Sequence, residues 1–253
     1  MVQELPRHTG VRGPALVRLL ARLTDADVPE PRQLLSDRLS QWLGWADAIA
    51  LSAALKGAPP AVPADRVPDE DGQDDYAKVR AALESAIAAS NAPSVPRHRG
   101  QQRAALRAEA RPPVQVDYAT YRRRYRSLQQ TMETSIASLR TRLRTTLAAM
   151  TPDMARLAVV DAAMEQTLGE REQYLLAGVP ALLQKHFDRL QAAEQAVLAG
   201  DPAPQQAGAN KPGAWLDVFC KDMQRVLLAE LDIRLQPVEG LVSALRACQP
   251  RTL

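Results

Sequence analysis

The sequence has few of the residue types that mark β-sandwiches, disulfide scaffolds and metal centres. Aromatic residues make up 4% of the 253 residues, and there are only two cysteines, Cys220 and Cys248, and three histidines. Two isolated cysteines exclude a disulfide framework and favour a reducing compartment. The hydrophobic fraction of 46% consists mainly of Ala and Leu, a balance that favours aliphatic helix packing over an aromatic-rich sheet.

Long uninterrupted apolar runs are missing as well. No stretch approaches the ~20 apolar residues that a membrane-spanning helix needs. Near the N-terminus, Arg18 and Arg22 interrupt the apolar residues 16–23 and so exclude a signal-peptide core. We therefore expect no transmembrane segment and a cytoplasmic location, unless a partner holds the protein at a membrane complex.

The motifs of catalysis and cofactor binding are also absent. There is no glycine-rich phosphate loop, no nucleophile elbow and no histidine and glutamate pattern of the metalloprotease type. His8, His98 and His186 lie far apart in the sequence, and none has a second ligand at metal-binding spacing. We expect a surface or packing role for His186. For Glu165, Glu170 and Glu172 we expect solvated surface charges or end-of-helix electrostatics. The sequence thus predicts no catalytic residue, no cofactor and no metal ligand.

Charge and proline divide the chain into five parts. Residues 64–75 carry six acids against a single arginine, whereas residues 97–144 carry twelve arginines against three acids. Proline-rich stretches mark linkers because proline cannot continue a helix. The predicted parts are an N-terminal helical unit (1–57), an acidic Pro-rich linker (58–73), a short helix (74–90), a mobile Arg/Pro-rich segment (91–116) and a C-terminal helical bundle (117–253).

The longest predicted helix begins after Asp117, a good N-cap, and extends to Met150 without a proline or glycine. Its apolar residues recur every three or four positions, which predicts a coiled-coil-like seam. Thr151 and Pro152 predict a stop and the start of a new helix. The predicted fold class is all-α: a helical bundle with a long central coiled-coil-like helix and a small N-terminal helical unit.

Three further residues predict interruptions in the later helices. Gly169 predicts a break or a close contact, and Pro180 predicts a kink or two shorter helices. Pro237 predicts the start of a last short helix that ends near Ala247.

A cluster of arginines and tyrosines is the most suggestive local feature of the sequence. It consists of Tyr118, Tyr121, Arg122, Arg123, Arg124, Tyr125 and Arg126. One interpretation is a nucleic-acid or phospholipid surface, with arginine on phosphate and tyrosine stacking on bases. The other places the tyrosines on the apolar seam and the arginines on solvated faces. We favour the second, because the tyrosine spacing of three and four residues is the spacing of a seam.

The three tryptophans are expected to anchor the core. They are Trp42, Trp45 and Trp215. Trp45 follows Gly44, and an exposed Trp45 would be a candidate docking anchor.

Three segments together resemble a bacterial family of uncharacterised helical proteins. They are LSQWLGWADAIALSAAL (39–55), the Tyr-Arg cluster (118–126) and LAVVDAAMEQTLGEREQYLL (157–176). The resemblance covers most of the chain outside the two linkers and brings no established catalytic residues. Genes of that family often lie beside genes for stator-like proton channels and OmpA-like envelope proteins. The resemblance therefore implies a cytoplasmic accessory of a cell-envelope complex.

The sequence leaves three classes of function open. We favour a non-enzymatic scaffold or adaptor that acts by protein contact, with a protein partner or with self-association through the long helix. The alternative is a nucleic-acid-binding protein that uses the Arg-rich helix around 118–144. An enzyme with an unfamiliar all-helical site is the third class, and a deep polar pocket that contains His186 or the acids from Glu165 to Glu172 would favour it.

Overall fold

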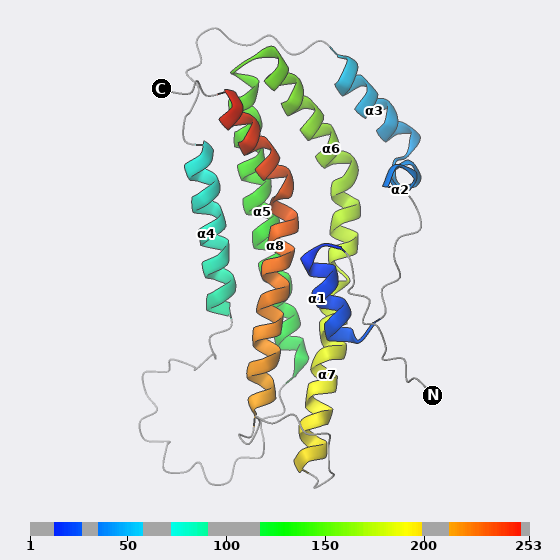
Figure 1. The fold of residues 1–253 in the computed structure, drawn as a ribbon, viewed down its shortest axis with the longest axis vertical. Helices are drawn as coiled ribbons and strands as arrows, with labels where there is room; N and C mark the ends of the chain where they lie inside the picture. Colours follow the sequence, from blue (N-terminus) through cyan, green and yellow to red (C-terminus); the bar gives the residue numbers. More distant parts are fainter. Residues whose placement is uncertain (1–12, 27–34, 58–71, 91–116, 199–212, 249–253) are drawn as a thin grey trace, which may run out of the picture.

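A computed structural model describes residues 13–26, 35–57, 72–90, 117–198 and 213–248 (Figure 1). Within these ranges every regular element is an α-helix, which confirms the predicted all-α bundle. The elements are α1 (Ala15–Thr24), α2 (Leu35–Trp42), α3 (Trp45–Lys56), α4 (Gly72–Ser90), α5 (Tyr118–Ala148), α6 (Pro152–Leu176), α7 (Val179–Leu198) and α8 (Ala214–Cys248). Most of the acidic linker, all of the Arg/Pro-rich segment, His8 and His98 lie outside the described residues.

The two longest helices, α5 and α8, lie side by side and run in the same direction along the long axis of the molecule (Figure 1). The connection through α6 and α7 returns the chain to the starting end, so both of these helices are antiparallel to α5 and α8. Helix α4 packs against α5 and α8 from the other side. None of the helices in the described ranges is long and apolar enough to cross a membrane.

The apolar seam of α5 is buried within a single chain. Its buried residues are Tyr118, Tyr125, Met132, Ile136, Leu139, Leu143 and Leu147. Helices α4, α6, α7 and α8 all contact α5. Because the seam is already covered, self-association through it would require the bundle to open.

The predicted starts of α5 and α6 are confirmed. The Asp117 side chain accepts a hydrogen bond from the Ala119 N–H at 2.9 Å and so caps α5. The Thr151 hydroxyl accepts from the Met154 N–H at 3.3 Å, and Pro152 takes the first position of α6. Proline suits that position because its missing N–H would have no partner within the helix.

The predictions for Gly169 and Pro237 are wrong. Gly169 lies inside α6, and no described atom lies within 4 Å of the position that a Cβ would take, so it marks neither a break nor a close contact. Helix α8 continues through Pro237 because Leu235, Val238 and Leu241 are all buried on one face. This burial outweighs the ~3 kcal/mol that a proline costs in a helix interior.

Pro180 fits the predicted alternative of two shorter helices. Helix α6 ends at Leu176, and α7 begins at Val179, so Pro180 falls in the first turn of α7. Proline is tolerated there.

The helices before residue 91 occupy three separate places. Helix α1 packs against α7 and α8, α3 packs on α6, and α4 belongs to the bundle itself. In Figure 1, α3 lies along the outer side of the upper half of α6. Helix α4 also begins at Gly72, two residues inside the predicted linker (58–73). The bundle therefore contains more of the chain than residues 117–253.

We predict that Gly169→Ala and Gly240→Ala each raise the free energy of unfolding by about 0.5–1 kcal/mol, because Gly is poor in a helix interior. No described atom lies within 4 Å of either new Cβ. Gly72→Ala is the matched control, because its Cβ would lie 3.0 Å from Leu245 Cδ1 and 3.2 Å from Leu143 Cδ2. Urea unfolding should show a higher free energy of unfolding for Gly169→Ala and Gly240→Ala, and no increase for the control. A loss for Gly169→Ala would contradict the prediction.

Candidate functional site

A buried carboxylate, Glu230 of α8, lies at the centre of the bundle with no exposed surface. It accepts hydrogen bonds from Tyr125 Oη at 2.6 Å, from Gln129 Nε2 at 2.9 Å and from Arg234 Nε at 3.0 Å. Gln129 also donates to the carbonyl of Leu176, the last residue of α6, at 3.1 Å. This Glu230 cluster therefore links α5, α6 and α8.

The chemistry of the Glu230 cluster is that of a satisfied core network. Burial, and then the nearby charge of Glu230, raise the pKa of Tyr125 well above its ordinary value, so the phenol stays neutral and donates. Both oxygens of Glu230 accept from groups within the cluster. Because a buried charge is tolerated only when it is paired and hydrogen-bonded, these contacts indicate a structural role.

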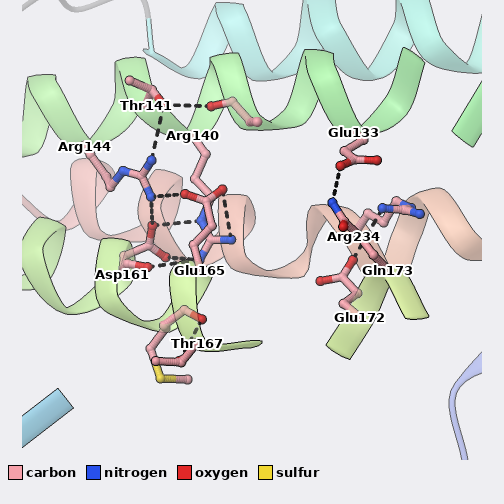
Figure 2. A network of polar contacts seen from close by, with 12 residues as sticks. Glu133, Arg140, Thr141, Arg144, Asp161, Glu165, Thr167, Glu172, Gln173 and Arg234 are labelled. Carbon is pink, nitrogen blue, oxygen red and sulfur yellow. Dashed lines mark hydrogen bonds and ion pairs between the residues drawn. The ribbon is translucent and has the colours of Figure 1, made fainter. Parts of the chain in front are cut away.

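A second polar cluster, the α5–α6 ion ladder, lies between Arg140 and Arg144 of α5 and Asp161 and Glu165 of α6 (Figure 2). Arg140 donates from Nε and Nη2 to the two oxygens of Asp161 at 2.8 and 2.7 Å. Arg144 Nη1 lies 3.2 Å from the same carboxylate and also contacts Glu165. Both pairs have i, i+4 spacing, which places each pair on one face of its helix.

The ladder corrects the expectation that the acids within 165–172 are solvated charges. Glu165 pairs with both arginines of the ladder. Glu172 lies 3.7 Å from Arg234 Nη1 (Figure 2), and only Glu170 is exposed. For Arg140, burial opposes the charged form, but the hydrogen bonds and charge of Asp161 outweigh it and raise the pKa. The Arg140 guanidinium therefore stays charged in the ladder.

His186 has the packing role that its sequence context predicts. It is buried on α7, and its Nε2 lies 3.0 Å from Asp222 Oδ2 on α8. Its Nδ1 lies 3.2 Å from Nη2 of Arg189, which also donates to the carbonyl of Leu23 at the end of α1. Because a guanidinium can only donate, Nδ1 accepts and Nε2–H donates to Asp222. His186 thus helps to hold α1 on the bundle.

Asp222 is ionised in this arrangement. Burial tends to raise its pKa, but the hydrogen bonds from His186 and Arg225 and the positive charge of Arg225 outweigh burial, so the pKa is lowered. In the described part of the chain, no group of three or more His, Cys, Asp or Glu side chains is placed to hold a metal ion.

The tyrosines of the predicted arginine and tyrosine cluster point into the bundle. Tyr118 and Tyr125 are buried, and Tyr121 is half-buried. Tyr118 and Tyr121 pack against the rings of Phe187 and Phe219 at centroid distances of 5.3–6.2 Å. Tyr118 also donates to the carbonyl of Pro180, and burial raises the pKa of Tyr118 to about 12. These rings are therefore not available to stack on bases.

The arginines of that cluster do not form one common contact. Arg122, Arg123 and Arg126 are exposed, whereas Arg124 donates to the carbonyl of Ser90 at the end of α4. Arg124 thus fastens α4 to α5. The structure separates the cluster into buried tyrosines and arginines with different surroundings, as the seam interpretation predicts.

Trp45, the last of the predicted site residues, has 84% of its surface exposed. It begins α3, where the Gly44 N–H donates to the Asp47 side chain at 3.0 Å. None of the twelve residues of α3, all of them described, is buried. The large apolar side chains Ile49 and Leu55 are also exposed.

Two aromatic residues that the sequence did not single out as a pair lie beside α3. The guanidinium of Arg171 on α6 lies 5.5 Å from the ring of Trp42 and 5.9 Å from the ring of Tyr174. Tyr174 is 74% exposed, and its neighbour Leu175 is exposed too. Trp42 and Arg171 are 129 positions apart, and no sequence signal could have joined them.

We predict that Asp161→Asn lowers the free energy of unfolding by about 2 kcal/mol, because it leaves Arg140 and Arg144 with one carboxylate instead of two. The control is Asp153→Asn, whose side chain is 86% exposed and whose ion pair is 4.0 Å long. It should cost less than about 1 kcal/mol. Urea unfolding at neutral pH measures the free energy of unfolding of both variants. If both lose the same amount relative to wild type, the ladder does not stabilise the fold.

We also predict that Glu172→Gln gains stability relative to wild type as the pH rises. Burial raises the pKa of Glu172 above 4.5, and the positive charges of Arg234 and Arg140 only partly offset it. The folded state therefore binds this proton more tightly than the unfolded state, and wild-type stability falls as the pH rises from 4.5 through the folded pKa. Urea unfolding across that range, with the exposed Glu170→Gln as control, tests the sign. A Glu172→Gln variant whose free energy of unfolding falls relative to wild type as the pH rises would refute it.

The comparisons with known proteins identify a family and no individual relative. No curated protein and no solved structure matches the chain. One family model matches residues 1–247, which is nearly the whole sequence. The chain belongs to the family described as "Protein of unknown function (DUF3348)".

Proposed function

We propose that this protein is a non-enzymatic scaffold that acts by protein contact through α3. The observation that carries the proposal is that α3 is apolar on all sides and yet contains no buried residue. Its sequence, WADAIALSAALK, has only Asp47, Ser52 and Lys56 as polar residues. A helix that is apolar all round is normally buried, so a partner that covers α3 would complete its packing.

One side of α3 packs on α6, and the other faces away from the bundle. Asp47, Leu51, Ser52 and Ala54 are only partly exposed. Three of them, Asp47, Leu51 and Ala54, recur at steps of four and three and so share the side that faces α6. The exposed residues of α3 define the α3 outer face: Trp45, Ala46, Ala48, Ile49, Ala50, Ala53, Leu55 and Lys56. Contiguous exposed apolar surface of this kind marks interaction sites in soluble proteins.

The residues beside α3 have the composition of a binding hot spot. Trp, Tyr and Arg are the residue types that contribute most energy at protein interfaces. Trp42, Arg171 and Tyr174 stack together there, and Trp45 follows within three residues of Trp42. Stacking on two rings limits the motion of the Arg171 guanidinium, which reduces the entropy lost on binding.

The interior of the bundle supports a scaffold role because its charged groups are engaged with one another. The Glu230 cluster and the α5–α6 ion ladder hold α6 against α5 and α8. Helix α6 in turn carries α3. The bundle therefore presents α3 on a fixed support.

The nucleic-acid alternative has less support. Three exposed arginines, Arg122, Arg123 and Arg126, supply positive charge, but Tyr118 and Tyr125 are buried and cannot stack on bases. The resemblance noted above favours a cytoplasmic location and a cell-envelope complex as the assembly that the scaffold serves.

Site-specific photo-cross-linking in cells that express the chain naturally tests this function. A photoreactive benzoylphenylalanine replaces Trp45 or, in a second variant, Tyr174. The control position is Gln130, an exposed residue of α5. We expect protein adducts at position 45 and, more weakly, at 174, and none above background at 130. If position 45 gives no more adduct than position 130, α3 is not a docking surface.

A further inference from the structure

Helix α4 is held on the bundle by surface charges and by little burial. It lies along one side of the molecule, against α5 and α8 (Figure 1). Of its described side chains only Leu83 and Ile87 are buried, whereas α5 and α8 each bury a long apolar seam. Arg80 of α4 lies 2.7 Å from Asp232 and 3.3 Å from Glu239, two half-exposed carboxylates of α8. Dissolved salt therefore weakens these contacts.

Two arginines of α5 hold the ends of α4. Arg142 Nη2 lies 3.2 Å from Asp75 in the first turn of α4, and Arg124 donates to the carbonyl of Ser90, its last residue. An acid at the start of a helix and a positive charge at its end are both favoured by the helix dipole. The side of the bundle under α4 thus has a basic edge on α5 and an acidic edge on α8. These edges fix both the direction and the rotation of the helix that lies there.

The surface between the two edges is apolar. A Cβ on Gly72, the first residue of α4, would lie 3.0 Å from Leu245 Cδ1 and 3.2 Å from Leu143 Cδ2, so α4 begins directly on these leucines. The α4-binding face is the side of α5 and α8 that α4 covers, and it includes Arg124, Arg142, Leu143, Asp232, Glu239 and Leu245.

We propose that the α4-binding face is a second interaction surface, on which a helix of a partner protein replaces α4. It is separate from α3, and its occupation does not depend on the function proposed for α3. The contacts of α4 define the chemistry of the partner, which is an amphipathic helix with an acid in its first turn and an arginine five positions later. Two large apolar residues follow at three and seven positions after that arginine, as Leu83 and Ile87 follow Arg80. Amphipathic helices bind apolar grooves of other proteins in this way.

Two features allow α4 to leave while the rest of the bundle stays together. The Glu230 cluster and the α5–α6 ion ladder join α5, α6 and α8 through residues of those three helices alone. Residues 58–71 and 91–116 separate α4 from α3 and α5, so the chain is long enough for α4 to move without either of them. Exposed ion pairs such as that of Arg142 and Asp75 add little to hold it.

Native-state hydrogen exchange of the wild-type chain tests the release of α4. The amides of α4 should exchange faster than the buried amides of α5 and α8, because they open locally. Raising NaCl from about 50 mM to about 1 M should increase the α4 rates several-fold and leave α5 and α8 unchanged, because salt screens the contacts of Arg80 and Arg142. If α4 exchanges as slowly as α5 and α8 at both salt concentrations, it opens only with the whole bundle, which would overturn the proposal.

A fluorescent peptide of residues 72–90 tests the partner chemistry by anisotropy. In the full chain with Arg80→Glu, the new carboxylate lies opposite Asp232 and Glu239 and weakens the resident α4. This chain should bind the peptide with a Kd about tenfold or more below that of wild type, whose own α4 occupies the face. The control chain, Arg156→Glu, reverses a half-exposed arginine of α6 whose contact with Asp153 is 4.0 Å long, and it should bind as wild type does. A peptide that carries Arg80→Glu should bind none of the three chains.

The peptide assay can overturn the proposal in several ways. If the Arg80→Glu chain loses its helical circular dichroism, α4 is an inseparable part of the fold. If that chain stays folded and binds no peptide, the face accepts no helix from outside. Equal binding of the two peptides would mean that the charged edges do not select the partner. A wild-type dimer that the peptide dissociates would mean that the occupant is the α4 of a second copy and no other protein.

Discussion

Glu230 places a carboxylate where α5, α6 and α8 meet, out of contact with water. An unpaired charge there would cost several kcal/mol, so the surrounding helices must bring donors to it. Tyr125 and Gln129 do so from α5, and Arg234 from the next turn of α8. A shift of α8 by one residue would take Glu230 away from Tyr125 and Gln129, whereas Arg234 would move with it. The need to satisfy one buried carboxylate therefore sets the register of the long helices.

The α5–α6 ion ladder extends this constraint toward the end of the bundle where α5 meets α6. Apolar seams alone would let two long helices slide by a turn with little loss, since one leucine can replace another. Arg140 and Arg144 can meet Asp161 and Glu165 in one register only, because each pair has a fixed spacing. Arg124, Arg142 and Arg189 likewise fasten α4 and α1 to their neighbours. These five arginines thus serve contacts between helices.

The bundle and α3 differ in how far their apolar side chains are buried. The long helices bury their apolar residues and pair their inner charges, whereas α3 exposes Trp45, Ile49 and Leu55. Small proteins seldom leave a helix of this composition uncovered, because hydrating its apolar surface is unfavourable. Its packing on α6 gives it a fixed direction. This contrast is the reason for placing the proposed contact surface on α3.

The sequence by itself determined the helical class, the caps at Asp117 and Thr151, and the seam that holds Tyr118 and Tyr125, because periodicity and capping are local properties. It could not determine the course of α8 through Pro237, which depends on buried contacts of that helix with its neighbours. It identified Trp45 as a docking anchor only on condition of exposure. Only the tertiary structure decided which charges meet, since Glu230 and Tyr125 are 105 positions apart and Asp222 and His186 are 36 apart. Pairings between distant positions follow from how the helices pack, and a single sequence carries no local signal for them.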